Sequence, residues 1–344
     1  MNRRTLFLII FLSAMALMLS ACLEDLFNSP EEETTDTTDD SFVGKWCLVT
    51  QSVNGALSTR GTIITMNDDG TGVHQSSEDS SSFTWSTENS VLKVSPSNGD
   101  SFTATFRFGD NTVTLSYEDN GETYVEKYAK YTGERNADLI GKWTGVRSTA
   151  DGADQVPAMT VTMNSDGAAT AFFMDSTNIK SQEFSWTTSG NYLLNDLLCE
   201  DSDMWTGIEY TLSAPLLSGK EYYEEGYEYI SIFVKDIGEK DENLAGVWNL
   251  TGLKYNGVTS PIIPQGWSFT LDATSGSGTF TQGSTVVTYS WTTNTGYLLL
   301  YPTAASQIGA GQTYTISGNT LTFSVAINAG ESGYSIATYT FTKQ

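Results

Sequence analysis

The sequence predicts an all-β fold arranged as tandem repeats. Apolar and polar residues alternate along many short segments, and residues 159–163 are typical, with Met, Val and Met separated by threonines. This period of two, enriched in Thr, Val, Tyr and Phe, is characteristic of half-buried strands. Turn-forming residues recur about every 8–12 residues, a spacing that favours an antiparallel sandwich or barrel.

Three copies of one set of motifs define the domain organisation. Gly-x-Trp occurs at residues 44–46, 141–143 and 246–248, with steps of 97 and 105 residues between the tryptophans. Each copy continues with a strand, a Gly-bearing turn and an aromatic-x-Trp motif. It then closes on aromatic-x-Lys, at residues 128–130, 233–235 and 341–343. The repeats therefore span residues 42–134, 135–240 and 241–344, and each has enough chain for a small core of its own.

The N-terminus has the layout of an export signal. Arg3 and Arg4 precede an apolar run over residues 6–19, and Leu-Ser-Ala-Cys follows at residues 19–22. The charged start, the small residues before the Cys and an apolar run short for a transmembrane span all fit this interpretation. Leu-Ser-Ala-Cys resembles the bacterial lipobox, in which the Cys thiol receives diacylglycerol. We therefore expect residues 1–21 to be a lipoprotein signal peptide and Cys22 to carry the lipid that attaches the chain to a membrane.

A polar tether separates the lipid from the repeats. Residues 23–41 hold eight acidic residues and no basic one. Such a segment has little to bury and repels itself, so residues 22–41 should form a disordered, extended linker. We expect a lipid-anchored protein of the cell envelope at the outer membrane. Both its periplasmic face and its surface are compatible with the sequence.

Charge and cysteines narrow the classes of partner. The formal net charge is −24, and no segment after the signal is basic. Nucleic acid would be repelled, so it is not expected as a partner. Cys47 and Cys199 remain after lipidation of Cys22. Export permits a disulfide between them, but that bridge would join two repeats, and buried free thiols are the favoured interpretation.

A family resemblance adds a specific architecture. The Gly-x-Trp first strand, the early hairpin with an Asn/Asp-rich turn at residues 67–70 and the chain of short strands resemble the calycin group. The closest resemblance is to the lipocalin-like domains of bacterial lipoproteins, and it extends over residues 42–344. It implies three tandem small antiparallel β-barrels. In that family the Trp of Gly-x-Trp plugs one end of the barrel, a structural role that the resemblance gives to Trp46, Trp143 and Trp248.

The repeats also depart from true lipocalins. They are shorter, and they lack the later Thr-Asp-Tyr motif and the terminal Arg of that family. Short strands in an eight-stranded barrel leave an interior that side chains can fill. An apolar cavity above ~300 Å³ inside a barrel would support binding of a small hydrophobic ligand. Filled interiors would instead indicate a structural or adhesive module that contacts glycan or protein through the barrel loops.

No catalytic, cofactor-binding or metal-binding residues are predicted. The only histidine, His74, is expected at the surface, and one His cannot form a multi-His metal site. Residues 67–70 match a hairpin turn better than a calcium loop, and the acidic residues 200–203 favour a solvated loop. The glutamates of segment 221–228 are expected along a loop and a strand edge, not as a catalytic pair in a cleft. We therefore predict a non-enzymatic protein that acts in binding or display.

One segment is the candidate binding surface. Trp205 lies outside the repeated pattern in an expected loop, and Tyr222 and Tyr223 lie in an aromatic and acidic strip. Exposed aromatic rings would form a stacking platform for glycan or protein, whereas a loop-anchoring role is the more ordinary alternative.

Overall fold

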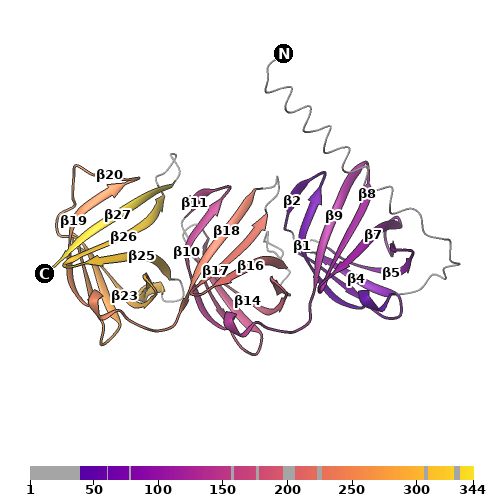
Figure 1. Cartoon of the computed structure of the whole chain (residues 1–344), viewed down its shortest axis with the longest axis horizontal. Helices are drawn as coiled ribbons and strands as arrows, with labels where there is room; N and C mark the ends of the chain where they lie inside the picture. The colour runs from indigo at the N-terminus through magenta and orange to yellow at the C-terminus, as the bar shows by residue number, and fades with distance from the viewer. Residues whose placement is uncertain are drawn as a thin grey trace, which may run out of the picture. The chain divides into compact units, whose positions relative to one another are not determined.

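The computed structural model describes most of the chain from residue 39 to its end. The described residues are 39–59, 61–76, 79–155, 159–175, 178–196, 206–222, 227–305, 309–328 and 334–344. They form three closed antiparallel β-barrels (Figure 1), so the predicted all-β fold with three tandem barrels is confirmed. All of them belong to one compact unit, Thr38–Gln344. The expected signal peptide, Cys22 and the expected tether up to residue 38 lie outside the described residues.

Barrel 1 begins with the short 3₁₀ helix η1 (Asp40–Phe42). Its strands are β1 (Gly44–Val53), β2 (Ala56–Ser58), β3 (Thr62–Met66), β4 (Thr71–Ser76), β5 (Ser80–Glu88), β6 (Val91–Pro96), β7 (Phe102–Gly109), β8 (Thr112–Asp119) and β9 (Glu122–Lys130). Each strand pairs with the next around the sheet, and β1 also pairs with β9, which closes the barrel. Eight strands form the closed barrel, while β2 pairs only with the end of β1.

Barrel 2 repeats this plan after η2 (Ala137–Leu139). Its strands are β10 (Gly141–Ala150), β11 (Ala153–Gln155), β12 (Met159–Met163), β13 (Ala168–Asp175), β14 (Asn178–Ser189), β15 (Tyr192–Asn195), β16 (Gly207–Ser213), β17 (Leu216–Tyr222) and β18 (Glu228–Asp236). Pairing of β10 with β18 closes it.

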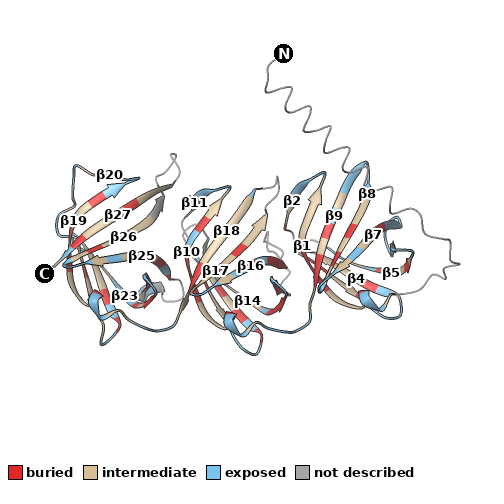
Figure 2. Ribbon diagram, viewed as in Figure 1, coloured by how far each residue is buried: buried red, intermediate tan, exposed pale blue. Residues whose placement is uncertain are grey.

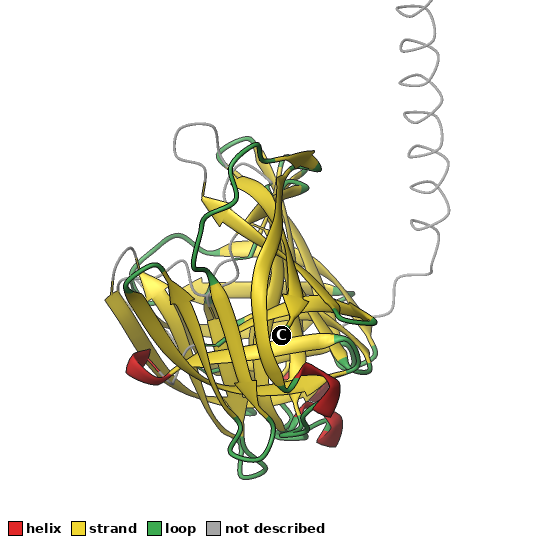
Figure 3. Cartoon of the chain, turned by 90° about the vertical axis from the view of Figure 1, so that its left-hand side faces the viewer, coloured by secondary structure: helices red, strands yellow, loops and turns green. Residues whose placement is uncertain are grey.

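Barrel 3 follows η4 (Glu242–Leu244). Its strands are β19 (Gly246–Tyr255), β20 (Val258–Thr259), β21 (Ser268–Asp272), β22 (Ser277–Gln282), β23 (Thr285–Asn294), β24 (Tyr297–Pro302), β25 (Ala310–Ser317), β26 (Thr320–Asn328) and β27 (Tyr334–Lys343), with η5 (Thr303–Ala305) after β24. Pairing of β19 with β27 closes it. Figure 3 shows strands almost throughout, with helix confined to single short turns. Within the described part of the chain, no helix has the length and apolar character needed to cross a membrane.

The first strand of each barrel contains a β-bulge at the same place. In barrel 1 the register with β9 shifts between Leu48 and Thr50, and equivalent shifts fall between residues 145 and 147 and between 250 and 252. A bulge bends its strand and increases the local twist. This bend allows one strand to pair with β3 over its first half and with the short β2 over its end.

Each barrel has its own apolar core. The alternation of the strands places one set of side chains inside, visible as buried bands along the strands in Figure 2. In barrel 1 this core includes Phe42, Trp46, Trp85 and Tyr128, and barrels 2 and 3 have matching clusters around Trp143 and around Trp248. Closed barrels also leave no long unpaired edge that could recruit another strand.

Barrels 1 and 2 are joined by the outer face of β1. Cys47 and Val49 on that face are buried and pack against Leu194 of β15. Thr206 of barrel 2 accepts a hydrogen bond from the Thr62 amide at 3.2 Å, and its hydroxyl lies 2.9 Å from the Thr62 carbonyl oxygen, to which it donates. The joint between barrels 1 and 2 therefore combines apolar packing with buried hydrogen bonds.

Barrels 2 and 3 are joined by the same surfaces. On β10, the Thr144 hydroxyl lies 2.7 Å from the hydroxyl of Tyr301, which in turn donates to the Asp236 carboxylate at 2.7 Å. The Lys142 ammonium stands 3.4 Å from the centroid of the Tyr301 ring. The two joints therefore place the first strand of one barrel against the sixth and seventh strands of the next barrel, so the contact repeats along with the fold.

Candidate functional site

The Gly-x-Trp tryptophan of each barrel lies beside the short 3₁₀ helix that precedes the first strand. Trp46, Trp143 and Trp248 are buried, and each indole N–H donates to the carbonyl of the residue four positions earlier, at 2.6, 2.7 and 2.8 Å. That carbonyl belongs to the last residue of the short 3₁₀ helix, whose own side chain is buried in the barrel. This geometry agrees with a plug, and the role itself stays a proposal carried by the resemblance.

The Lys that closes each repeat lies beside the tryptophan of the same barrel. The ammonium groups of Lys130, Lys235 and Lys343 stand 5.2, 5.4 and 5.0 Å from the ring centroids of the three tryptophans. Each also donates to a carbonyl of the 3₁₀ helix. The Gly of Gly-x-Trp has a φ near +130° in all three copies, and a Cβ there would lie about 3 Å from the Lys chain. The first and last motifs thus form one structural unit, which the sequence patterns did not link.

Each barrel also contains a cavity. The volumes are about 290 Å³ in barrel 1, 90 Å³ in barrel 2 and 170 Å³ in barrel 3. An apolar cavity of about 150 Å³ is already large enough to hold benzene. None of the three cavities exceeds the ~300 Å³ expected for a small hydrophobic ligand, and barrel 1 comes nearest to it. Barrels 1 and 3 have room for a small organic molecule, whereas barrel 2 has room for little more than a few solvent-sized groups.

A buried carboxylate lies in the wall of the barrel 1 cavity. Glu126 is 8% exposed. Its Oε1 accepts hydrogen bonds from Gln51 Nε2 at 2.7 Å and from the Tyr117 hydroxyl at 3.0 Å, and its Oε2 accepts from the Tyr128 hydroxyl at 2.9 Å. Burial together with the negative carboxylate raises the pKa of both tyrosines, so they remain neutral donors. The group is thus held by three neutral hydrogen bonds rather than by a cation.

His74 faces this cavity, which corrects the expectation of a surface histidine. It lines the space together with Glu126, because β4 pairs His74 with the inward Ile64 of β3. Burial lowers the pKa of His74, and the carboxylates of Glu126 and Asp79 oppose that effect less strongly. The imidazole is therefore neutral at neutral pH.

Aromatic rings mark the outer margin of the same cavity. Phe102 lines it and is 38% exposed, so the cavity reaches the surface there. The ring of Tyr117 lies 5.3 Å from Phe102 and is stacked on Tyr124 at 5.0 Å. The Tyr124 hydroxyl donates to the exposed carboxylate of Glu122 at 3.1 Å. The entrance thus combines aromatic faces with negative charge.

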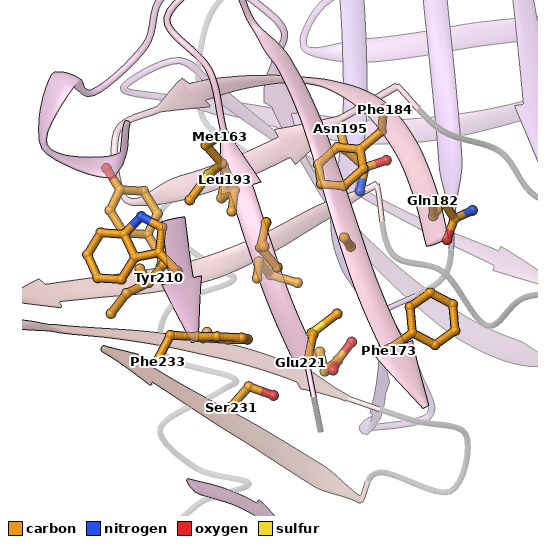
Figure 4. A pocket seen from close by; sticks show the side chains of 17 residues that line it. Met163, Phe173, Gln182, Phe184, Leu193, Asn195, Tyr210, Glu221, Ser231 and Phe233 are labelled. Atoms are coloured by element: carbon orange, nitrogen blue, oxygen red, sulfur yellow. The ribbon is translucent and has the colours of Figure 1, made fainter. Parts of the chain in front are cut away.

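Barrel 2 places a single carboxyl group in an apolar cavity. Figure 4 shows the side chain of Glu221 among the lining residues, which include Phe173, Ser231 and Phe233. Burial alone raises its pKa to about 7, and its carboxyl group has no hydrogen-bond or ion-pair partner among the described residues. The expectation of a loop or strand-edge position for Glu221 is wrong, because the alternation of β17 turns it inward with Leu217 and Gly219.

The cavity of barrel 3 is lined mainly by aromatic and aliphatic side chains. The lining residues are Phe269, Phe280, Tyr289, Leu300, Gln312, Phe323, Val325 and Tyr339. The Oε1 atom of Gln312 is buried and has no hydrogen-bond partner among the described residues. No charged side chain lines this cavity in the described part of the chain, so it offers shape but little polar recognition.

The predicted aromatic binding surface is only partly described. Tyr222 ends β17, and its backbone is occupied by barrel 1, because its amide donates to the Thr59 hydroxyl at 2.6 Å and its carbonyl accepts from the Thr59 amide at 2.6 Å. The Lys220 ammonium stands 5.2 Å from the Tyr222 ring. Trp205 and Tyr223 lie outside the described residues.

The structure also locates some of the residues considered above for a disulfide or a metal site. Cys47 is a buried free thiol, as favoured, and Cys199 lies outside the described residues. In the turn at residues 67–70, Asp69 accepts from the amide and hydroxyl of Thr71 at 2.9 and 2.6 Å, so that carboxylate serves the turn. Residues 200–203 lie outside the described part. Among the described residues, no group of three or more His, Cys, Asp or Glu side chains is arranged to hold a metal ion.

No known family model and no curated protein matches the sequence. Among solved structures, the chain is similar to transferrin binding protein B, isotype 1, from serogroup B Neisseria meningitidis, with 10% identity and a TM-score of 0.22. It is also similar to a double mutant of transferrin binding protein B from Haemophilus parasuis Hp5, with 7% identity and a TM-score of 0.19. Each match covers 83% of this chain and 66% of the other, so the chain spans just under two thirds of their length.

Proposed function

We propose that this chain is a lipid-anchored lipoprotein of the cell envelope that binds a small, largely apolar ligand inside barrel 1. The observation that carries the binding role is the 290 Å³ cavity of barrel 1, whose mostly apolar walls bring Glu126 and His74 together. Binding sites for small molecules are typically concave, mainly apolar and equipped with a few placed polar groups. We also propose that the chain binds its ligand without catalysing a reaction.

A volume-filling variant tests the binding role. Val94 is buried and lines the barrel 1 cavity, so Val94→Phe should fill part of it. Val325→Phe makes the same change in the smaller cavity of barrel 3 and is the matched control. Binding of toluene and benzyl alcohol to the full chain in zwitterionic lipid nanodiscs is measured by saturation-transfer NMR. Val94→Phe should weaken binding at barrel 1, and any change caused by Val325→Phe measures binding at barrel 3, whose 170 Å³ also exceeds the space that benzene needs. If neither compound binds any variant, the ligand-binding proposal fails, and a glycan array then tests the adhesive alternative.

The anchor is tested separately. Cells grown with labelled palmitate should label the wild-type protein, and Cys22→Ser should abolish the label and release the protein from the membrane fraction. Protease treatment of intact cells decides the face. Digestion before lysis shows surface display, and digestion only after lysis shows a periplasmic position.

A further inference from the structure

The barrel 1 cavity has an uncompensated negative charge. Its lining residues include no Lys or Arg, and its titratable members are His74, Tyr117, Glu126 and Tyr128. Three neutral donors hold the Glu126 carboxylate without cancelling its charge. Burial of a charge is costly unless it is paired, and the neutral imidazole of His74 does not pair it. A cation is the missing component.

The surroundings of Glu126 also favour a cation with an organic body. A carboxylate has about four lone-pair directions, and three are used here, so one further donor can be accepted. The rings of Phe102, Tyr117 and Tyr124 at the margin offer π-faces, which attract ammonium groups electrostatically. The exposed Glu122 adds negative charge at the same margin. The apolar remainder of the wall, which includes Leu92 and Leu115, suits a hydrocarbon or aromatic body.

We propose that barrel 1 selects a small organic ammonium, with its nitrogen beside Glu126 and its apolar body in the cavity. This proposal rests on the ligand-binding function proposed above and specifies the chemical class of the ligand. The space of about 290 Å³ accepts a single aromatic ring with a short amine. Barrel 2 also places a carboxyl group in its interior, but its cavity is far smaller, and barrel 3 has no charge there among its described residues.

Matched probes of one shape test the charge selectivity. Benzylammonium, benzyl alcohol and benzoate are titrated into the full chain in zwitterionic nanodiscs by calorimetry, and empty nanodiscs are subtracted. We expect benzylammonium to bind at least tenfold more tightly than benzyl alcohol, and benzoate not to bind. Glu126→Gln should reduce benzylammonium affinity by about 10- to 100-fold, as expected for loss of a charged hydrogen-bond partner, and leave benzyl alcohol within about twofold. Glu118→Gln removes an exposed charge from the neighbouring strand and should change neither.

A second variant protects the test against misfolding of Glu126→Gln. Phe102→Leu changes a partly exposed ring and should weaken benzylammonium about threefold, in line with loss of one cation–π contact, without a matching change for benzyl alcohol. Equal affinity for benzylammonium and benzyl alcohol would overturn the ammonium proposal while the binding function stands. Absence of binding by every probe would remove both proposals.

Discussion

The carboxyl group of Glu221 should make barrel 2 less stable as the pH rises. Its pKa is raised from the ordinary 4.5 to about 7 because the group is buried in an apolar cavity. Below pH 4.5 the group is protonated in both the folded and the unfolded chain and has no effect on stability. Between pH 4.5 and 7 the unfolded chain releases its proton while the folded barrel retains it, so the free energy of unfolding falls.

The size of the effect follows from the pKa difference. Each pH unit across this window costs about 1.4 kcal/mol, so the folded chain loses about 3 kcal/mol between pH 4.5 and 7. Above pH 7 the loss is constant. Glu221→Gln keeps the size and hydrogen-bonding character of the side chain but cannot ionise. Its stability relative to the wild type should therefore rise by about 3 kcal/mol across the same window and then level off.

Urea unfolding at several pH values measures this difference. The transition of barrel 2 can be followed through its own buried tryptophans, Trp143 and Trp186, in a background that replaces the other tryptophans with Phe. Glu183→Gln is the matched control, because Glu183 is exposed on β14 of the same barrel. A difference between Glu221→Gln and the wild type that stays flat from pH 4 to 8 would refute the buried-carboxyl account. The account would also be refuted if Glu183→Gln changed the pH dependence of the free energy of unfolding as much as Glu221→Gln does.

Three further predictions concern the joint between barrels 1 and 2 and the contact between Lys130 and Trp46. Burial raises the pKa of the Cys47 thiol to about 12, so iodoacetamide should alkylate it only in denaturant, and rapid native labelling detected by peptide mapping would contradict the buried joint. A Cβ at Gly207 would lie 2.5 Å from a Val49 methyl group, so Gly207→Ala should loosen this joint and speed labelling of Cys47 at least tenfold, whereas Gly99→Ala, where the nearest atom is 3.8 Å away, should not. Lys130→Met removes the ammonium beside Trp46 and should lower the free energy of unfolding by about 1 kcal/mol. Urea denaturation measures this change, and unchanged stability would contradict a stabilising role for the ammonium.

The alternation of inward and outward side chains along a strand was enough to predict two residues of the barrel 1 cavity, Glu126 and His74. Tyr128 belongs to the repeated aromatic-x-Lys motif, so an inward Tyr128 makes Glu126, two residues earlier, inward as well. The turn at residues 67–70 fixes the hairpin register of β3 and β4, which pairs His74 with Ile64. Both positions were therefore accessible from alternation and turn chemistry. The expectation of a surface His74 did not use this alternation.

The cavity volumes could not be read from the repeats in the same way. Equivalent inward positions hold Leu115 in barrel 1, Gly219 in barrel 2 and Phe323 in barrel 3, as the register of the last two strands shows. Interior space depends on how all such side chains pack together, and packing differences of one methylene already matter. The repeated motifs fix the scaffold of a barrel, while the unrepeated inward residues determine whether it holds a ligand.

The joints were also hidden from pattern analysis, although their chemistry repeats. Val49 on the outer face of β1 lies against Gly207, and Val146 on the outer face of β10 lies against Gly311. A Cβ at either glycine would come within 2.5 Å of the facing valine methyl group. In each joint, an outward valine on the first strand of one barrel thus fits against an outward glycine on the next barrel, two strands before that barrel's last strand. Each half alone is unremarkable in sequence.

The same pair is replaced by other residues at the equivalent positions of β7 in barrel 1 and of β19 in barrel 3. A head-to-tail contact that repeats without closing can extend into a filament, and repeat arrays are bounded by terminal units with polar outer faces. In barrel 1 the register position of the joint glycine is held by Thr103, which pairs with Lys93 instead of with a leucine. In barrel 3 the outer face of β19 presents Asn249 and Thr251 where the other first strands present the residues of a joint. The incoming face of the first barrel is therefore blocked by a side chain and a charge, and the outgoing face of the last is polar, so neither end offers a new copy the apolar contact that joins the barrels within the chain.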